Sequence, residues 1–144
     1  MAVKTLDTLI KLHKHRVDLL RRELALINEQ IQQLEQVLAK LAEDVSREME
    51  MVTLNPDYAV FFAGYVRYVK DRQQKIAEEI ARLQHQADEK RSQIAEEFTE
   101  QKKFEIARTS QLKKILALEN TRNQQQLDEI AMQQFNILTS PQES

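Results

Sequence analysis

The chain has 144 residues, 42% of them apolar, a formal net charge of −2, one glycine, two prolines and no cysteine. So few turn-forming residues exclude a sandwich, a barrel or a doubly wound sheet. The lack of cysteine excludes a disulfide framework and a thiolate metal site and is typical of a reducing compartment. The remaining composition, rich in Ala, Leu, Ile, Glu, Gln, Lys and Arg, predicts an all-α protein.

The N-terminal segment and the hydropathy of the chain argue against a membrane protein. No stretch approaches the roughly 20 apolar residues needed to span a bilayer. The segment MAVKTLDTLIKLHKHR carries charges where a signal peptide would have its apolar core. We therefore expect a cytoplasmic protein without a transmembrane segment.

The first predicted helix covers residues 3 to about 50. Apolar side chains recur along it at alternating spacings of three and four, and such a repeat stays on one face only when the helix supercoils around a partner. His13 is the one polar residue in this stripe. The stripe consists of Val3, Leu6, Ile10, His13, Val17, Leu20, Leu24, Ile27, Ile31, Leu34, Leu38, Leu41 and Val45.

A turn is predicted at about residues 51–55, and a second helix at about 56–138. Asn55 is a preferred N-cap residue, Pro56 suits the first helical position, and Asp57 complements the helix dipole. A short connection makes the helices antiparallel neighbours, so residues 1–144 should form one coiled-coil hairpin. About the last 35 to 40 residues of helix 2 would overhang helix 1, either unpaired or awaiting a partner, and residues 139–144 should be a disordered tail.

The contact stripe of helix 2 is weaker than that of helix 1, because a glutamine and a lysine interrupt it. It is predicted to run through Phe62, Val66, Val69, Gln73, Ile76, Ile80, Leu83, Ala87, Lys90, Ile94 and Phe98. The spacing of three and four still indicates a coiled-coil strand.

The sequence predicts no catalytic, cofactor or metal site. Gly64 is the sole glycine, so neither a phosphate-binding loop nor a dinucleotide turn can form. His13 and His15 lie on different helical faces and His85 stands alone, which is poor spacing for a metal. Carboxylate pairs on solvated helices lack the pocket that acid-base catalysis needs.

Charge is segregated along both predicted helices. Residues 4–22 carry a net charge of +4 and residues 23–50 one of −5, while residues 73–100 carry −3 and residues 101–122 carry +4. In the hairpin the two basic segments would lie side by side. These blocks are either ordinary solvated faces or a basic end steered into an acidic socket. No aromatic residues interleave with the basic ones, so nucleic-acid binding is not expected.

The segment NPDYAVFFAGYVRYV, residues 55–69, holds all three tyrosines and two of the five phenylalanines. Phe62, Val66 and Val69 belong to the contact stripe, but a second stripe runs beside it, and the two stripes together are wider than one partner helix can cover. The second stripe consists of Tyr58, Phe61, Tyr65, Tyr68 and Arg72. It either plugs the turn against Met49, Met51, Val52 and Leu54 or forms a docking surface, since Tyr, Phe and Arg are enriched where binding energy concentrates.

The chain resembles the FliJ family of the bacterial flagellar type III export apparatus. The resemblance rests on its length, on the helix start N-P-D-Y-x-x-F-F-x-x-Y and on the C-terminal ENTRNQQQLDEIAMQQF. It implies a non-enzymatic, stalk-like coiled coil whose open end enters the hexameric export ATPase. It also implies contact with the cytoplasmic domain of an FlhA-like export gate, escort of export chaperones, and peripheral membrane association through these partners, without a cofactor.

The resemblance also implies site residues. The export-gate contact would fall on Tyr58, Phe61, Tyr65, Tyr68 and Arg72. The ATPase contact would fall on Lys14, Arg16, Arg21, Arg22, Lys102, Lys103, Arg108, Lys113 and Lys114. Two other functions stay open: a coiled-coil scaffold or tether, such as a parallel homodimer through the helix 1 stripe, and a helical export chaperone. The related injectisome system also stays open.

Overall fold

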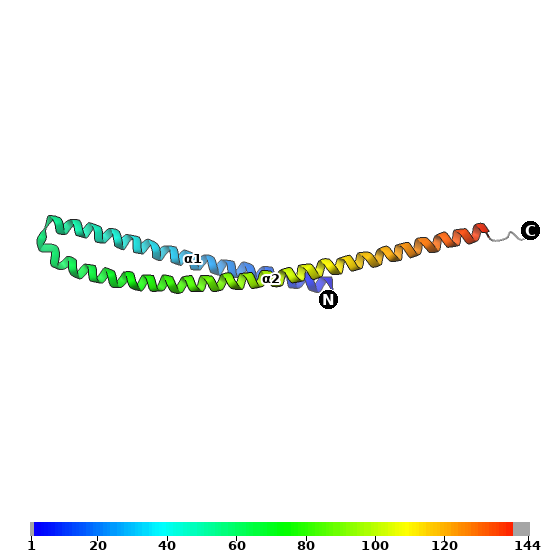
Figure 1. Ribbon diagram of the computed structural model, residues 1–144, viewed down its shortest axis with the longest axis horizontal. Coiled ribbons are helices and arrows are strands. Elements are labelled where there is room, and N and C mark those ends of the chain that lie inside the picture. The colour runs from blue at the N-terminus through cyan, green and yellow to red at the C-terminus, as the bar shows by residue number, and fades with distance from the viewer. Residues whose placement is uncertain (1, 140–144) are drawn as a thin grey trace, which may run out of the picture. The chain divides into compact units, whose positions relative to one another are not determined.

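The computed structural model describes residues 2–139 and contains two long helices joined by one short turn (Figure 1). Helix α1 spans Val3–Leu54, the short 3-10 helix η1 spans Pro56–Tyr58, and helix α2 spans Ala59–Thr139. Residues 2–139 contain no strand. The predicted all-α fold of two long helices packed on each other is confirmed.

Helix α1 ends at Leu54, so residues 51–54, expected to be part of the turn, are helical. The amide of Asn55 still donates to the Met51 carbonyl, at 3.0 Å. The helix stops there because Pro56 disfavours the helical conformation of the residue before it, and Asn55 is extended, with φ −139° and ψ 94°. Its side chain accepts from the Asp57 amide at 3.3 Å, which is the predicted capping role. Helix α2 runs to Thr139. The rest of the predicted tail, residues 140–144, lies outside the described residues.

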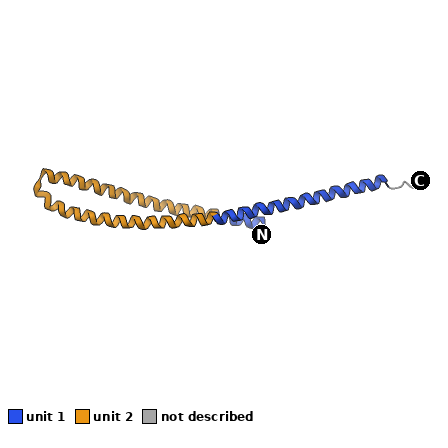
Figure 2. Cartoon of the chain, viewed as in Figure 1, with its two compact units in different colours: residues 1–13, 99–144 blue, residues 14–98 orange. Residues whose placement is uncertain are grey.

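The chain divides into two compact units (Figure 2). Unit 2 comprises residues 14–98 and contains the turn. Unit 1 comprises residues 1–13 and 99–144, and both units contain a piece of α1 and a piece of α2. Each unit is a pair of helical segments with its own buried contacts.

In unit 2 the α1 and α2 segments pack through residues spaced alternately three and four apart. The buried side chains there are Val17, Leu41, Val69, Ile80, Leu83 and Ala87. Lys90 also lies on this stripe, half-buried, with its Nζ 2.6 Å from Glu23 of α1. Because α2 covers the apolar stripe of α1, that stripe is not available for a parallel homodimer.

Phe98 does not occupy the inward position that the sequence predicted. Its side chain is 41% exposed, and the Arg21 guanidinium lies over its ring, 5.1 Å from the centroid. After Ile94 a strict alternation of three and four places Glu97 inward, and Glu97 is half-buried. The prediction followed the apolar residue type, whereas the packing follows the helical period.

In unit 1 the first turns of α1 pack on residues of α2 that are mostly polar. Leu6, Ile10 and His13 are buried, and the His13 ring stacks on Phe104 with centroids 5.4 Å apart. Asp7 forms an ion pair with Arg108. The half-buried α2 positions continue the three-and-four spacing through Gln101, Phe104, Arg108 and Gln111. Every residue from 112 to 139 is exposed, so the stretch without cover begins later than the predicted overhang.

We expect Leu83→Ala to lower the free energy of unfolding by about 2–5 kcal/mol, because Leu83 is only 3% exposed and its truncation leaves a cavity in the seam. Urea unfolding followed by circular dichroism at 222 nm measures this change. Leu26→Ala is the matched control, since Leu26 is 60% exposed and should lose little. Equal losses in the two variants would contradict the observed packing.

Candidate interaction surfaces

The aromatic stripe after the turn divides into two sides in the structure. Tyr58 and Tyr65 are half-buried, whereas Phe61 is 75% and Tyr68 is 57% exposed. The Tyr58 hydroxyl donates to the Glu48 carboxylate of α1 at 2.7 Å. Tyr58 and Tyr65 therefore close the turn against α1, and Phe61 and Tyr68 remain available to a partner.

The electrostatic surroundings of the two half-buried tyrosines favour their protonated state. The hydrogen bond to the Glu48 carboxylate is the main cause that raises the pKa of Tyr58 above its usual value of 10.0. Partial burial raises the pKa of Tyr65, and the nearby Asp44 and Glu48 carboxylates raise it further. A phenolate at either position would face carboxylates of α1, which like-charge repulsion opposes.

Two apolar residues close to the turn, Leu54 and Val60, are exposed as well. We call the four exposed residues at this end the turn surface: Leu54, Val60, Phe61 and Tyr68. Arg72 Nη1 donates to the Tyr68 hydroxyl at 3.3 Å, and the rings of Phe61 and Tyr58 stack with centroids 6.1 Å apart. Of the two alternatives for this stripe, the plug against Met49, Met51, Val52 and Leu54 accounts for little of it, because Met49, Met51 and Leu54 are exposed and only Val52 is half-buried.

Sequence reasoning did not assign Leu54 and Val60 to a docking surface. Each lies two residues from an inward position, Val52 or Phe62, and therefore points away from the seam. The two-residue spacing from Val52 and Phe62 is the signal in the sequence that marks both residues as outward-facing. Neither residue belongs to the aromatic stripe of Tyr58, Phe61, Tyr65 and Tyr68.

The four candidate ATPase-contact cations in unit 2 are exposed, and two of them contact α2: Lys14, Arg16, Arg21 and Arg22. Arg16 lies 3.8 Å from Glu97, and Arg21 covers the Phe98 ring. Next to them a groove of about 400 Å³ is lined by Arg16, Leu19, Leu20, Glu23, Gln93, Glu96 and Glu97. The predicted pairing of two basic segments therefore holds only for the part of α1 in unit 1, where Asp7 and His13 contact Arg108 and Phe104. In unit 2 the basic residue Arg16 lies near Glu97 of α2 instead.

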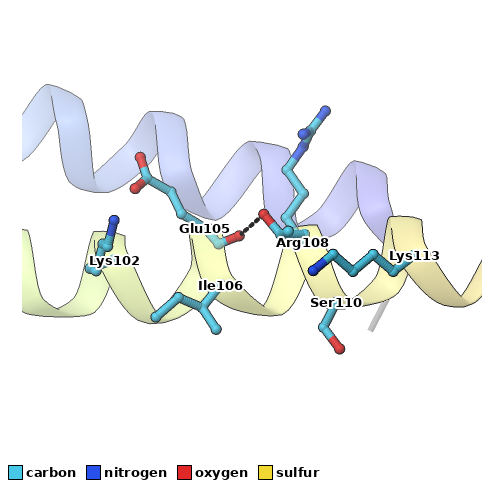
Figure 3. A pocket seen from close by; sticks show the side chains of 7 residues that line it. Lys102, Glu105, Ile106, Arg108, Ser110 and Lys113 are labelled. Carbon is cyan, nitrogen blue, oxygen red and sulfur yellow. Dashed lines mark hydrogen bonds between the residues drawn. The ribbon is translucent and has the colours of Figure 1, made fainter.

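The other five candidate cations lie on α2 in unit 1: Lys102, Lys103, Arg108, Lys113 and Lys114. Arg108 is the half-buried one and pairs with Asp7, while Lys103 Nζ lies 3.0 Å from Glu100. A shallow groove of about 590 Å³ runs along this part of α2 (Figure 3). It is lined by Lys102, Glu105, Ile106, Arg108, Thr109, Ser110 and Lys113. Its cationic lining suits an acidic partner.

Residues 2–139 bring no group of three or more histidine or carboxylate side chains together in a way that would hold a metal ion. His13 is buried against Phe104, and His85 Nε2 lies 3.1 Å from Glu89 on its own helix. Over the same residues, neither helix carries a segment long and apolar enough to cross a membrane.

The model of one protein family, described as the flagellar FliJ protein, matches residues 2–137. The match covers both helices almost completely and includes both candidate surfaces. Searches of curated proteins and of solved structures returned no match.

The contacts of Tyr58 and Tyr65 predict that the stability of the fold falls at high pH. In the folded protein these tyrosines have a pKa above 10.0, the usual value that we take for the unfolded chain. Each tyrosine therefore stabilises the fold fully at pH values below its unfolded pKa. This stabilisation is lost as the pH rises through the folded pKa. We therefore expect late-titrating tyrosines in an absorbance titration at 295 nm. Glu48→Gln should bring the Tyr58 titration toward lower pH, because it removes the hydrogen bond to the carboxylate, which is the main cause of the raised pKa, and also the negative charge that repels the phenolate. An unchanged titration in this variant would contradict the Glu48 contact.

Proposed function

Because the chain belongs to the FliJ family, we propose that it is a non-enzymatic coupling stalk of a flagellar type III protein export apparatus. In this role it connects the hexameric export ATPase with the export gate at the cytoplasmic face of the apparatus. Contact with export chaperones is part of the same proposal. The observation that carries it is the turn surface, where large apolar side chains are exposed beside the turn of the helix pair.

The gate contact is assigned to the turn surface together with Arg72. Phe61 and Tyr68 lie on one side of α2 four and three residues from Tyr65, which itself faces α1. Aromatic residues and arginine concentrate binding energy when a partner desolvates them. Tyr58 and Tyr65, first expected to touch the gate directly, act in this proposal as supports that hold α2 against α1.

The ATPase contact is assigned to the exposed cations of unit 1, with Lys113 and Lys114 as its centre. Neither lysine is within ion-pair distance of a carboxylate of residues 2–139, whereas Lys103 and Arg108 already have acidic neighbours. Lysines without a neighbouring carboxylate offer their full charge to an acidic socket, and such a contact weakens as salt screens it. The candidate contact residues Lys14, Arg16, Arg21 and Arg22 belong to unit 2 and are exposed there.

We expect Phe61→Ala with Tyr68→Ala to abolish detectable binding to the cytoplasmic domain of the export gate, because two exposed aromatic anchors are removed. Isothermal titration calorimetry with the purified domain measures the affinity. Helicity and melting temperature should stay close to those of the parent protein, since both side chains are exposed.

Phe98→Ala is the control for this gate experiment, as Phe98 is an exposed aromatic residue elsewhere on α2. It should leave gate affinity unchanged. If the double variant at the turn surface binds as tightly as the parent protein, the proposed gate contact is wrong. A large fall in its melting temperature would show that these side chains serve the fold.

We expect Lys113→Glu with Lys114→Glu to reduce binding to the cognate export ATPase at low salt by about tenfold or more, because attraction becomes repulsion. Binding and stimulation of ATP hydrolysis are measured over a series of salt concentrations. The matched control is Lys70→Glu with Lys75→Glu, which reverses two exposed lysines of unit 2 outside the proposed contact. If both double variants weaken ATPase binding equally, binding depends on the overall charge of the protein and not on Lys113 and Lys114.

A further inference from the structure

In unit 2, helix α1 carries exposed leucines beside the apolar stripe that α2 covers. Leu19 is 43% exposed and Leu26 is 60% exposed. Together with Arg16 and Glu23 they form what we call the leucine stripe, in which successive residues are three, four and three positions apart. At 100° per residue the four positions fall within an arc of about 80°, next to the buried stripe. Helix α1 therefore offers a second face with the spacing of a coiled-coil strand.

The unit 2 groove of about 400 Å³ runs between the two helices along this leucine stripe. Leu19 and the half-buried Leu20 are its apolar lining residues. A helix laid along the pair returns its side chains to the same face every seven residues, which is the distance from Leu19 to Leu26. An extended peptide would return them every two residues. The spacing therefore favours a helix as the occupant of this groove.

The α2 side of the same groove is acidic. Glu96 and Glu97 line it, and Glu89 lies seven residues before Glu96 on the same face of α2. Glu97 lies 3.8 Å from Arg16, and Glu89 lies 3.1 Å from His85. No lysine or arginine of residues 2–139 lies within ion-pair distance of Glu89 or Glu96, and both side chains are exposed. These two carboxylates are available to cations of a partner.

Other cations of unit 2 do not neutralise this side of the groove. Lys14 and Arg21 lie on the opposite side of α1 from the leucine stripe, where the Arg21 guanidinium covers the Phe98 ring. Lys90 pairs with Glu23 of α1, at 2.6 Å. The groove thus combines exposed leucines on one helix with uncompensated carboxylates on the other, which favours a partner that is both apolar and basic.

We propose that this groove binds a basic amphipathic helix of a partner protein. The apolar face of that helix covers Leu19 and Leu26, and its lysines or arginines pair with Glu89 and Glu96. Burial of the leucines supplies affinity, while the carboxylates discriminate against acidic helices by like-charge repulsion. This third binding surface goes beyond the coupling role and rests on neither of the two contacts assigned to that role.

A synthetic helix tests the proposal. The probe is a fluorescent peptide of about three heptads with leucine at the first and fourth positions of each heptad and lysine at the flanking positions. Anisotropy on titration with the full chain should show saturable binding that weakens as salt is added. Leu19→Ala with Leu26→Ala, and separately Glu89→Lys with Glu96→Lys, should each weaken it by about tenfold or more.

Two controls separate this contact from a general attraction between opposite charges. Glu29→Lys with Glu43→Lys makes the same change of charge at exposed positions on the outward face of α1, so it should leave the affinity unchanged. A peptide with glutamate in place of lysine should bind the parent protein about tenfold more weakly or worse. It should regain affinity for the variant Glu89→Lys with Glu96→Lys, because the charges are exchanged and remain complementary.

Three results would overturn the proposal. The first is no saturable binding of the basic peptide, and the second is equal weakening by the control pair. The third is a dimer of the chain alone in sedimentation velocity that Leu19→Ala with Leu26→Ala abolishes, since the leucine stripe would then be covered by a second copy. The experiment contains neither the export ATPase nor the export gate, so its failure leaves the proposed coupling role unaffected.

Discussion

The structure depends on the burial of the α1 apolar stripe by α2. On an isolated helix, an apolar stripe that repeats every 3.5 residues would stay exposed to water. Its burial requires the partner helix to present its own residues at the same spacing. Positions such as Glu97 are inward because the period places them there, whatever their polarity. The packing of Leu83 and Val69 stabilises the pair, and the polar positions on the same stripe decide where it is weaker.

Some of the polar inward positions lie close to the proposed interaction surfaces, although others, such as Gln73 and Lys90, lie in the middle of unit 2. In unit 2, Glu48 follows the apolar stripe of α1 toward the turn, and its hydrogen bond with Tyr58 holds the turn while Phe61 stays exposed. In unit 1, Gln101 and Arg108 take inward positions on α2, and the apolar contact between the helices ends a few residues later. At each of these places the second helix leaves apolar or charged side chains exposed, and such side chains can bind a partner.

Most of the fold was predictable from the order of the residues. The single break at Asn55–Pro56 in a glycine-poor chain required two long helices, and the spacing of apolar residues required that they pack. The errors were local: α1 continued through residues that carry no helix breaker, and Phe98 was assigned inward because it is apolar. Both follow from reading residue type where backbone continuity and helical period decide.

The sequence by itself determined the helices, their antiparallel pairing and the presence of surplus aromatic and basic residues, because those features depend on period, capping and composition. Only the tertiary structure decided which surplus residues are free. It turned Tyr58 and Tyr65 toward α1 and left Phe61 and Tyr68 outside, and it set Arg16 near Glu97. Such outcomes depend on the register between the helices, which local sequence does not encode, because the partners lie 10 positions apart for Tyr58 and Glu48 and far more for Arg16 and Glu97.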